Sequence, residues 1–407
     1  MSTKPTLRPL DFQPVYYQGR QMWHLRDPLR LSELQLFLPP ALAHLLTYLD
    51  GTRDPAEIRR AFSRDVGEEV DAALVDDTLA QLDRAFLLDN ERSRRAREEM
   101  LLAFRRQGER PPALAGAGYP ADPNDVIALF EAYGAQDDEA PDDGWRGRAV
   151  VSPHIDYQRG GPVYARVWRR AAASVADAEL VLIFGTDHNG GLGTVTLTEL
   201  PYSTPFGQLP AAPDVVRGLA QALGEENAFE LELNHRAEHS VELSAVWLHY
   251  ICHKLGRTPP PMVPILCGSF HHFVSNGHHP AQDGALNAFL QALRAASTGK
   301  KVLAVASVDL AHVGPAFGDP FAFNEARREA LRASDRSLIT AINDGDYDRF
   351  YDEIAAVGDR HHICGFSSTY LMLRYLQKVR GIQVAYEQCP ADEQGASFVS
   401  ICGLLLS

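Results

Sequence analysis

The stretch that decides the fold is Leu180-Val181-Leu182-Ile183-Phe184, followed directly by Gly185-Thr186-Asp187-His188. Five apolar residues without polar alternation are typical of a strand covered on both faces, as in a parallel sheet. Similar short runs occur at residues 149–151, 263–266, 302–306 and 398–406. Helical spacing lies between them, at 163–176, 215–223, 241–254, 286–296, 325–341 and 367–376. This alternation predicts an α/β domain with a doubly wound, mainly parallel sheet flanked by helices.

The first ninety residues show a different pattern, of apolar positions at helical spacing. Leucines at 42–49 mark a first helix, Asp54-Pro55 is a predicted N-cap and first turn of a second, and apolar residues at 75–86 mark a third. Leu87-Leu88 begins a short strand in this interpretation. The order predicts a small, mostly helical, winged-helix-like domain over residues 1–90.

A change in character separates this part from the rest of the chain. Residues 91–108 are dense in charge and predict a solvated connecting helix, which makes 109–407 the α/β domain. Residues 111–120 contain three prolines and two glycines, so they form neither a regular helix nor a strand. They are either a linker or the ordered start of the second domain.

Composition excludes several classes of protein. The formal net charge of −14 argues against a broad surface for nucleic acid or anionic membrane. No apolar stretch approaches the roughly 20 residues that span a bilayer. Five cysteines, an odd number without C-x-x-C spacing, suit a reducing compartment. We therefore expect a cytoplasmic protein without nucleic-acid or membrane partners.

Chemistry-bearing residues follow several of the predicted strands. His154 comes after the first apolar run and His188 after the second, and the loops at the carboxyl ends of strands form the ligand crevice of an α/β sheet. Asp309 and His312 follow the run at 302–306. A carboxylate there can orient imidazoles, although a turn capped by aspartate explains it equally well.

Two further motifs lie at predicted helix starts. In Glu238-His239-Ser240-Val241-Glu242, His239 and Glu242 are three residues apart, so we expect them to share a face, with Glu242 orienting His239. Glu238 and Ser240 are interpreted as capping residues. Cys364 precedes Gly365 and a helix, a position that favours the thiolate. The histidine pairs at 271–272 and 278–279 are interpreted as surface residues of a polar loop.

In this order, the motifs resemble those of the MEMO family, whose bacterial and archaeal members are called AmmeMemoRadiSam system protein B. The resemblance runs from about residue 110 to the carboxyl terminus and begins at Ala115–Pro120, which implies that this stretch is ordered. It continues through Pro153-His154, Gly185-x-x-His188, Glu238-His239-Ser240-x-Glu242, Ser307-x-Asp309-x-x-His312 and Ile363-Cys364-Gly365. Residues 28–90 resemble the PqqD-like winged helices that bind leader peptides. A helical appendage that packs on the second domain or forms a dimer is an equally good interpretation of those residues.

The resemblance implies a metal site. The MEMO family is similar in structure to class III extradiol dioxygenases, and its metal ligands are two histidines and a cysteine. Carried over to this chain, His154, His188 and Cys364 are the metal ligands, and His239, Asp309 and His312 form the catalytic wall of the pocket. The thiolate favours copper or zinc, and the dioxygenase likeness favours iron. We expect one transition metal ion, iron or copper before zinc.

This chain departs from the family pattern at two acidic residues. Asp156 stands within the first motif, His154-Ile155-Asp156-Tyr157, and Asp187 precedes the second histidine. Both are expected near the site, where they would add hard oxygen ligands.

Three functions remain open from the sequence. The first is a metal-dependent, dioxygenase-like oxidoreductase acting on a small molecule or a peptide, in a peptide- or radical-SAM-linked modification pathway, with His239 or His312 transferring the proton. The second is a non-catalytic adaptor that binds a leader peptide through the amino-terminal domain. The third is a hydrolase with Cys364 as nucleophile, His239 or His312 as base and Asp309 orienting the base. The substrate and the oligomeric state are not specified by the sequence.

Overall fold

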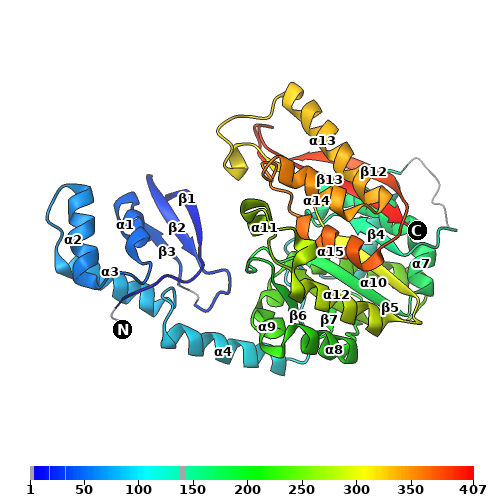
Figure 1. Ribbon diagram of the computed structural model, residues 1–407, viewed down its shortest axis with the longest axis horizontal. Coiled ribbons are helices and arrows are strands. Elements are labelled where there is room, and N and C mark those ends of the chain that lie inside the picture. The colour runs from blue at the N-terminus through cyan, green and yellow to red at the C-terminus, as the bar shows by residue number, and fades with distance from the viewer. Residues whose placement is uncertain (1–3, 18, 33, 138–143) are drawn as a thin grey trace. The chain divides into compact units, whose positions relative to one another are not determined.

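A computed structural model describes residues 4–17, 19–32, 34–137 and 144–407 (Figure 1). The chain forms two compact units, Met1–Arg106 and Gln107–Ser407, each described below by itself. Among the described residues, no helix is both long enough and apolar enough to cross a bilayer.

The second unit is built around one eight-stranded sheet. Its strand order is β11-β13-β4-β10-β5-β9-β6, with β12 paired to β13. The strands are β4 (Ala149–Ser152), β5 (Leu180–Thr186), β6 (Val195–Leu197), β9 (Met262–Cys267), β10 (Val302–Ser307), β11 (His312–Val313), β12 (Gly381–Pro390) and β13 (Phe398–Leu406). A separate hairpin joins β7 (Tyr202–Thr204) and β8 (Gly207–Leu209).

The centre of this sheet is parallel and covered on both faces. Strands β4, β10, β5 and β9 pair in parallel, whereas β6 and the carboxyl-terminal strands pair antiparallel. In β5, Leu180, Leu182 and Phe184 join one hydrophobic cluster and Val181 and Ile183 join another. The apolar run is continuous because alternate residues of the strand pack into hydrophobic cores on opposite faces of the sheet. The predicted α/β architecture, with a mainly parallel sheet flanked by helices, is confirmed.

Helices cover both faces of the sheet (Figure 1). One cluster includes residues of α5 (Pro123–Gly134), α6 (Tyr157–Arg170), α7 (Ala172–Asp177) and α10 (His239–Lys254). The other includes residues of α8 (Pro213–Leu223), α9 (Glu225–Phe229), α11 (His271–Asn276), α12 (Gly284–Ser297), α13 (Glu325–Asp344), α14 (Tyr347–Ala356) and α15 (Phe366–Leu376).

The strand register brings three strand ends to the same level. Ser307 at the end of β10 is aligned with Ser152 of β4 on one side and with Gly185 of β5 on the other. Residues two or three positions beyond these partners therefore leave the sheet side by side. They are Asp309, His154 and His188.

A buried arginine ties the start of this unit to α10. The Arg110 guanidinium pairs with Glu242 and donates to the carbonyls of His235 and Glu238, both at 2.8 Å. Glu242 also accepts the backbone N–H groups of Ala113 and Leu114, each at 2.9 Å, and the hydroxyl of Tyr119. The segment at 111–120 is thus an ordered part of the unit, as the family resemblance implies.

The amino-terminal unit has an antiparallel sheet that the sequence did not reveal. Its strands are β1 (Asp11–Tyr17), β2 (Arg20–Arg26) and β3 (Leu36–Leu38), and they precede α1 (Pro40–Leu45), α2 (Pro55–Val66), α3 (Ala72–Arg84) and α4 (Glu91–Arg106). Asp54 caps α2 in a capping box with Glu57, as predicted for the cap. Leu88 makes only an isolated bridge with Leu7, not a hairpin. The winged-helix order is therefore not confirmed. The prediction of a mostly helical domain missed three strands, because few of their residues are buried.

His235 illustrates the burial of polar groups next to α10. Its ring is fully buried in the turn Glu232–Arg236. Nε2 donates to the carbonyl of Thr196 at 3.2 Å, so Nδ1, 2.7 Å from the Tyr202 hydroxyl, accepts from it. Burial lowers the pKa of His235 from 6.5 to about 3.

We expect acid to destabilise the protein through His235. The unfolded chain takes up a proton at this ring below about pH 6.5, whereas the folded chain does not until about pH 3. The contribution of the neutral His235 ring to the free energy of unfolding is therefore complete above about pH 6.5. It decreases as the pH falls, by about 2–3 kcal/mol at about pH 4.5. Urea unfolding at about pH 6.5 and at about pH 4.5 measures how much stability is lost between them. This loss should be smaller by about 2–3 kcal/mol in His235→Gln than in the wild type. Equal losses in the two proteins would contradict the assignment.

Candidate metal centre

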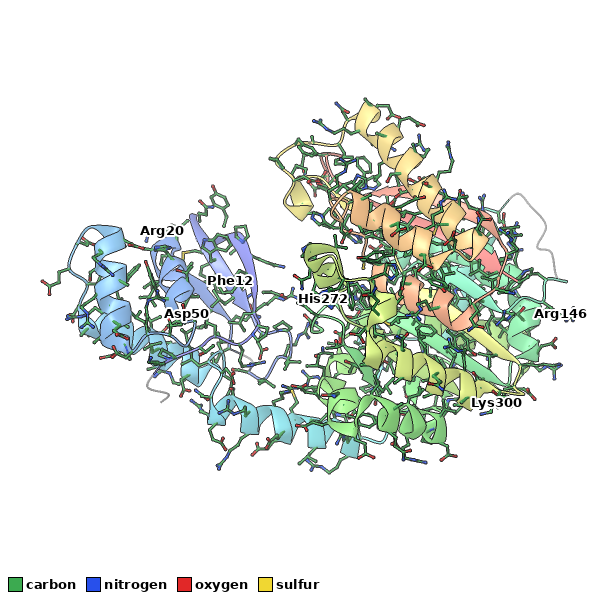
Figure 2. All side chains as sticks on the ribbon, in the orientation of Figure 1. Phe12, Arg20, Asp50, Arg146, His272 and Lys300 are labelled. Atoms are coloured by element: carbon green, nitrogen blue, oxygen red, sulfur yellow. The ribbon has the colours of Figure 1, made fainter. Side chains whose placement is uncertain are left out.

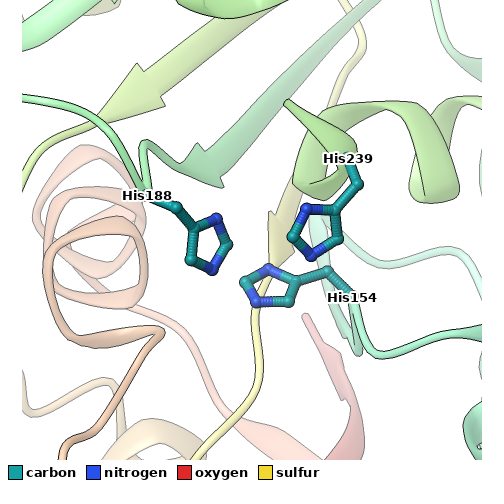
Figure 3. A group of neighbouring side chains, drawn as sticks. All are labelled: His154, His188 and His239. Atoms are coloured by element: carbon teal, nitrogen blue, oxygen red, sulfur yellow. The ribbon is translucent and has the colours of Figure 1, made fainter. Parts of the chain in front are cut away.

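Three histidines from separate elements converge at the carboxyl edge of the sheet (Figure 3). His154 follows β4, His188 follows β5, and His239 is the first residue of α10. One ligand atom from each lies within 4.8 Å of the others. The His154 ring is buried, whereas the side chains of His188 and His239 are 36% and 37% exposed. The cluster is therefore reachable from solvent on one side.

Cys364 directs its sulfur at the same point. Its Sγ lies 3.1 Å from Nε2 of His154 and 3.4 Å from Nε2 of His188. The backbone N–H of Cys364 donates to the carbonyl of Leu310, and that of Gly365 donates to the carbonyl of Asp309. The loop after β10 thus holds the thiol beside the two imidazoles, and the three ligands that the resemblance implies lie together.

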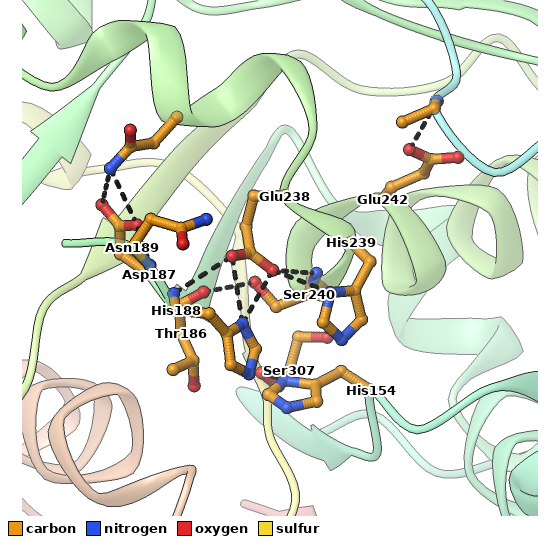
Figure 4. A network of polar contacts seen from close by, with 12 residues as sticks. His154, Thr186, Asp187, His188, Asn189, Glu238, His239, Ser240, Glu242 and Ser307 are labelled. Atoms are coloured by element: carbon orange, nitrogen blue, oxygen red, sulfur yellow. Dashed lines mark hydrogen bonds and ion pairs between the residues drawn. The ribbon is translucent and has the colours of Figure 1, made fainter. Parts of the chain in front are cut away.

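The second nitrogen of each ring is held by an oxygen acceptor (Figure 4). Nδ1 of His154 lies 2.9 Å from the carbonyl oxygen of Ser307, and Nδ1 of His188 lies 3.0 Å from the Glu238 carboxylate. Nδ1 of His239 lies 3.1 Å from the same carboxylate. An acceptor at Nδ1 keeps a proton there and turns Nε2 toward the cluster, so Nε2 is the atom that would bind a metal once the metal displaces its proton.

Glu238, not Glu242, orients these rings. Glu238 is buried at the N-cap of α10, where it also accepts the backbone N–H groups of Ser240 at 2.9 Å and His188 at 3.1 Å. The predicted role of Glu242 is wrong, because its carboxylate is buried against Arg110. The interpretation of Glu238 as a capping residue is correct but incomplete.

Charges in this cluster stabilise one another. Burial by itself raises the pKa of the Cys364 thiol, but His154 and His188 outweigh it and hold the pKa well below its ordinary value of 9.0. Burial likewise opposes the charged form of His154, but the Cys364 thiolate and then Asp309 raise its pKa to about 9. At His188, Glu238 and then Cys364 overcome burial and raise the pKa well above 6.5. These charges favour the thiolate form of Cys364, which is the form that ligates metals.

The donor atoms fit a small transition metal ion. Metal–nitrogen bonds of about 2.0–2.1 Å and a metal–sulfur bond of about 2.3 Å separate nitrogen from sulfur by roughly 3.6 Å at tetrahedral angles. The two observed nitrogen–sulfur distances, 3.1 and 3.4 Å, are close to this value. His239 supplies a further nitrogen at the rim of the group.

Asp309 is buried beside His154, whereas His312 lies farther out in the pocket wall. Asp309 is buried, accepts the backbone N–H groups of His154 and Ile155 at 2.9 and 3.1 Å, and lies 3.7 Å from Nε2 of His154. It positions the His154 loop. His312 lies farther out, with its ring against Phe317 at a centroid distance of 5.0 Å.

A pocket of about 510 Å³ opens beside Cys364 and His188. Its walls combine aromatic and aliphatic side chains with imidazoles and hydroxyls, contributed by Phe270, Phe317, Phe366, Ile363, His271, His312, His362, Ser269 and Ser367. Sequence interpretation placed His271 in a polar surface loop, but it begins the short helix α11 and lines this pocket.

The two extra carboxylates are engaged elsewhere. Asp156 is the N-cap of α6 and pairs with Arg159 on the surface. Asp187 lines the pocket but accepts from Nδ2 of Asn234 at 3.0 Å, and burial raises its pKa to about 6. The expectation that both supply oxygen ligands is therefore not supported.

Glu238→Gln should weaken metal binding by roughly 10- to 100-fold. The substitution keeps the size of the side chain but removes the charge that holds Nδ1–H of both His188 and His239. Competition with a chromophoric chelator measures the affinity. Asp156→Asn is the matched control, because Asp156 is two residues from His154 yet faces solvent. Equal affinity in Glu238→Gln and the control would rule out the orienting role.

Comparison with known proteins identifies the family. A family model described as Memo-like protein matches residues 110–404. A MEMO1 family protein of Aquifex aeolicus is 24% identical over 414 residues, covering 99% of each chain. One from Thermococcus kodakarensis is 30% identical over 263 residues, covering 63% of this chain and 83% of its own. The similarity to the Aquifex protein spans both units, and the family match includes every residue of the convergent cluster. The chain belongs to the Memo-like family, as its five motifs indicate.

Proposed function

We propose that this protein holds one transition metal ion between Nε2 of His154, Nε2 of His188 and Sγ of Cys364, and carries out metal-dependent redox chemistry. One observation carries the proposal: donor atoms remote in sequence meet within 3.1–3.4 Å, and oxygen acceptors at Nδ1 fix both imidazoles with Nε2 facing the sulfur. Such second acceptors are typical of metal-ligating histidines.

The donor set narrows the choice of metal. A thiolate with imidazoles favours soft or borderline ions, chiefly copper and zinc, and iron also accepts this set. Asp156 and Asp187 are engaged by Arg159 and Asn234, so neither carboxylate competes as a hard oxygen ligand for the ion. Iron or copper fits a redox role, and zinc would limit the site to Lewis-acid chemistry.

The remaining residues serve binding and proton transfer. A bound metal would supply electron transfer or polarisation of a substrate oxygen. His239, half-exposed and held at Nδ1 by Glu238, is placed to exchange a proton at Nε2. The pocket beside Cys364 takes a small molecule or the side chain of a peptide, and His312 at its wall is a second proton-transfer group.

Elemental analysis of protein purified without added metal tests the proposal. We expect about one equivalent of iron or copper in the wild type and its loss in His154→Ala and Cys364→Ala. Electron paramagnetic resonance should show a signal that ascorbate and air change reversibly. Retention of the metal in both variants would overturn the site, and a zinc-only protein would overturn the redox role.

The short sulfur–nitrogen distances also favour a second candidate, a hydrolase with Cys364 as nucleophile and His154 as base. Labelling of Cys364 with and without a chelator distinguishes the two candidates. A nucleophilic enzyme should be labelled at Cys364 by a thiol-reactive acyl probe, with labelling and turnover unaffected by a chelator. A metal centre should be protected from labelling until the chelator is added.

Peptide binding by the amino-terminal unit rests on a separate observation. Strand β1 pairs with β2 alone among the described residues, and Tyr16 on it is 84% exposed. An open strand edge with exposed aromatics can accept an extended peptide as a further strand. Calorimetry with peptides encoded by neighbouring genes, comparing wild type and Tyr16→Ala, tests this proposal and any link to a radical-SAM pathway. No binding by the wild type would remove its support.

A further inference from the structure

A second cavity lies at the opposite edge of the same sheet. Its walls come from the residues that lead into β4, β5 and β10, whereas the metal-ligating residues follow the other ends of these strands. The six residues of β10 alone separate the two edges by roughly 20 Å. Figure 2 shows Arg146 and Lys300 on the side of this unit away from His272. The cavity has a volume of about 400 Å³ and is called here the basic cavity.

Positive side chains dominate its lining. Arg146, Arg148, Lys300 and Lys301 line the basic cavity, and among the described residues Asp177 is the only acidic residue that does. Asp177 is paired with Nε of Arg146 at 3.1 Å. No ion pair to either lysine ammonium is found among the described residues. This excess of cations stands out in a chain whose net charge is −14.

Local structure accounts for part of this charge. Three helices end at the cavity, α7 at Asp177, α12 at Ser297 and α15 at Leu376. Each helix end carries about half a negative charge, so together they offset roughly half of the cationic excess. Arg148 compensates the negative end of α15 directly, because it donates to the carbonyls of Leu376 and Lys378 at 3.2 and 3.0 Å. Glu179 accepts the backbone N–H of Lys301 at 2.8 Å and keeps its negative charge beside the cavity. With Arg146 paired to Asp177 and Arg148 at the end of α15, the positive charge that remains available lies on Lys300 and Lys301.

The other lining groups suit an organic anion. Val302 and Leu376 contribute apolar surface. The hydroxyls of Ser174, Ser297 and Tyr375 also line the cavity, but they donate their protons to partners within the protein. The volume lies in the range of small-molecule sites, roughly 300–1,000 Å³. Clustered cations recognise phosphate oxygens, and an apolar wall receives the group that carries the phosphate. We propose that the basic cavity binds a phosphorylated small molecule, with Lys300 and Lys301 contacting the phosphates.

Calorimetry with ADP, pyrophosphate and citrate, on full-length protein treated with chelator, tests the proposal. The chelator prevents phosphate from binding to metal at the histidine cluster. We expect ADP and pyrophosphate to bind, and both to be weakened roughly tenfold or more in Lys300→Glu/Lys301→Glu. Stronger binding of ADP than of pyrophosphate identifies an organic phosphate, and preference for citrate over both would overturn the phosphate assignment.

Two controls make the result specific. Arg60→Glu/Arg64→Glu on α2 changes the net charge equally in the other unit and should leave binding unchanged. Cys364→Ser should also leave it unchanged, which separates this site from the metal centre. Lys301→Ala, with its milder effect, serves if the double variant does not fold. Absence of ADP binding by the wild type at millimolar concentration, or equal losses in the two double variants, would overturn the proposal.

Discussion

Cys364→Ser should weaken the binding of zinc or copper(I) by a factor on the order of 10²–10³. Structural zinc sites with four ligands bind with about 10–16 kcal/mol, or about 2.5–4 kcal/mol per ligand, which converts to this factor. Serine keeps the shape of the side chain but replaces a thiolate with a hydroxyl that stays protonated. Titration against a chromophoric chelator at fixed pH measures the effect.

The control for this prediction comes from the same pocket. His271 lines the pocket but is not part of the three-histidine group, so His271→Ala should retain the wild-type affinity. His188→Ala, in contrast, should lose as much affinity as Cys364→Ser. An unchanged affinity in Cys364→Ser would show that the sulfur is not a ligand.

Arg110→Ala should lower the free energy of unfolding by about 3–5 kcal/mol. The substitution leaves the Glu242 carboxylate buried without its counter-charge, and the carbonyls of His235 and Glu238 lose their donor. Because Glu242 also binds the backbone of the 110–119 segment, we expect that segment to loosen from α10. Urea unfolding followed by near-ultraviolet circular dichroism measures the loss.

Arg217→Ala provides the comparison for Arg110→Ala. Arg217 pairs with Glu199 and Asp214 at the surface, with half of its side chain exposed. Exposed pairs contribute about 0–1 kcal/mol, so this variant should be nearly as stable as the wild type. Similar losses in the two variants would mean that burial of the Arg110–Glu242 pair is not what stabilises this region.

The central fold was predictable because its strands are buried on both faces. Runs such as Leu180–Phe184 carry this signal, and all five predicted runs are strands of the sheet. Strand β12 was overlooked because most of its residues are only partly buried, which breaks the apolar run. The amino-terminal hairpin was overlooked for the same reason, since few residues of β1 and β2 are buried.

The convergence of the proposed metal ligands was predictable from strand ends and motif order, but the groups that support them were not. Spacing of three residues suggested that Glu242 faces His239. However, α10 begins at His239, and side chains in a helix point toward its amino end, where Glu238 lies. The acceptor for His154 is the backbone carbonyl of Ser307, which no side-chain motif encodes. The position of the Ser307 carbonyl beside His154 depends on the register that aligns β4 with β10.

X-ray absorption spectroscopy of the metal-loaded protein tests the central claim most directly. We predict one sulfur neighbour at about 2.3 Å and imidazole nitrogens at about 2.0 Å, with the sulfur lost in Cys364→Ser and retained in His271→Ala. A wild-type spectrum with nitrogen and oxygen neighbours only would contradict the account.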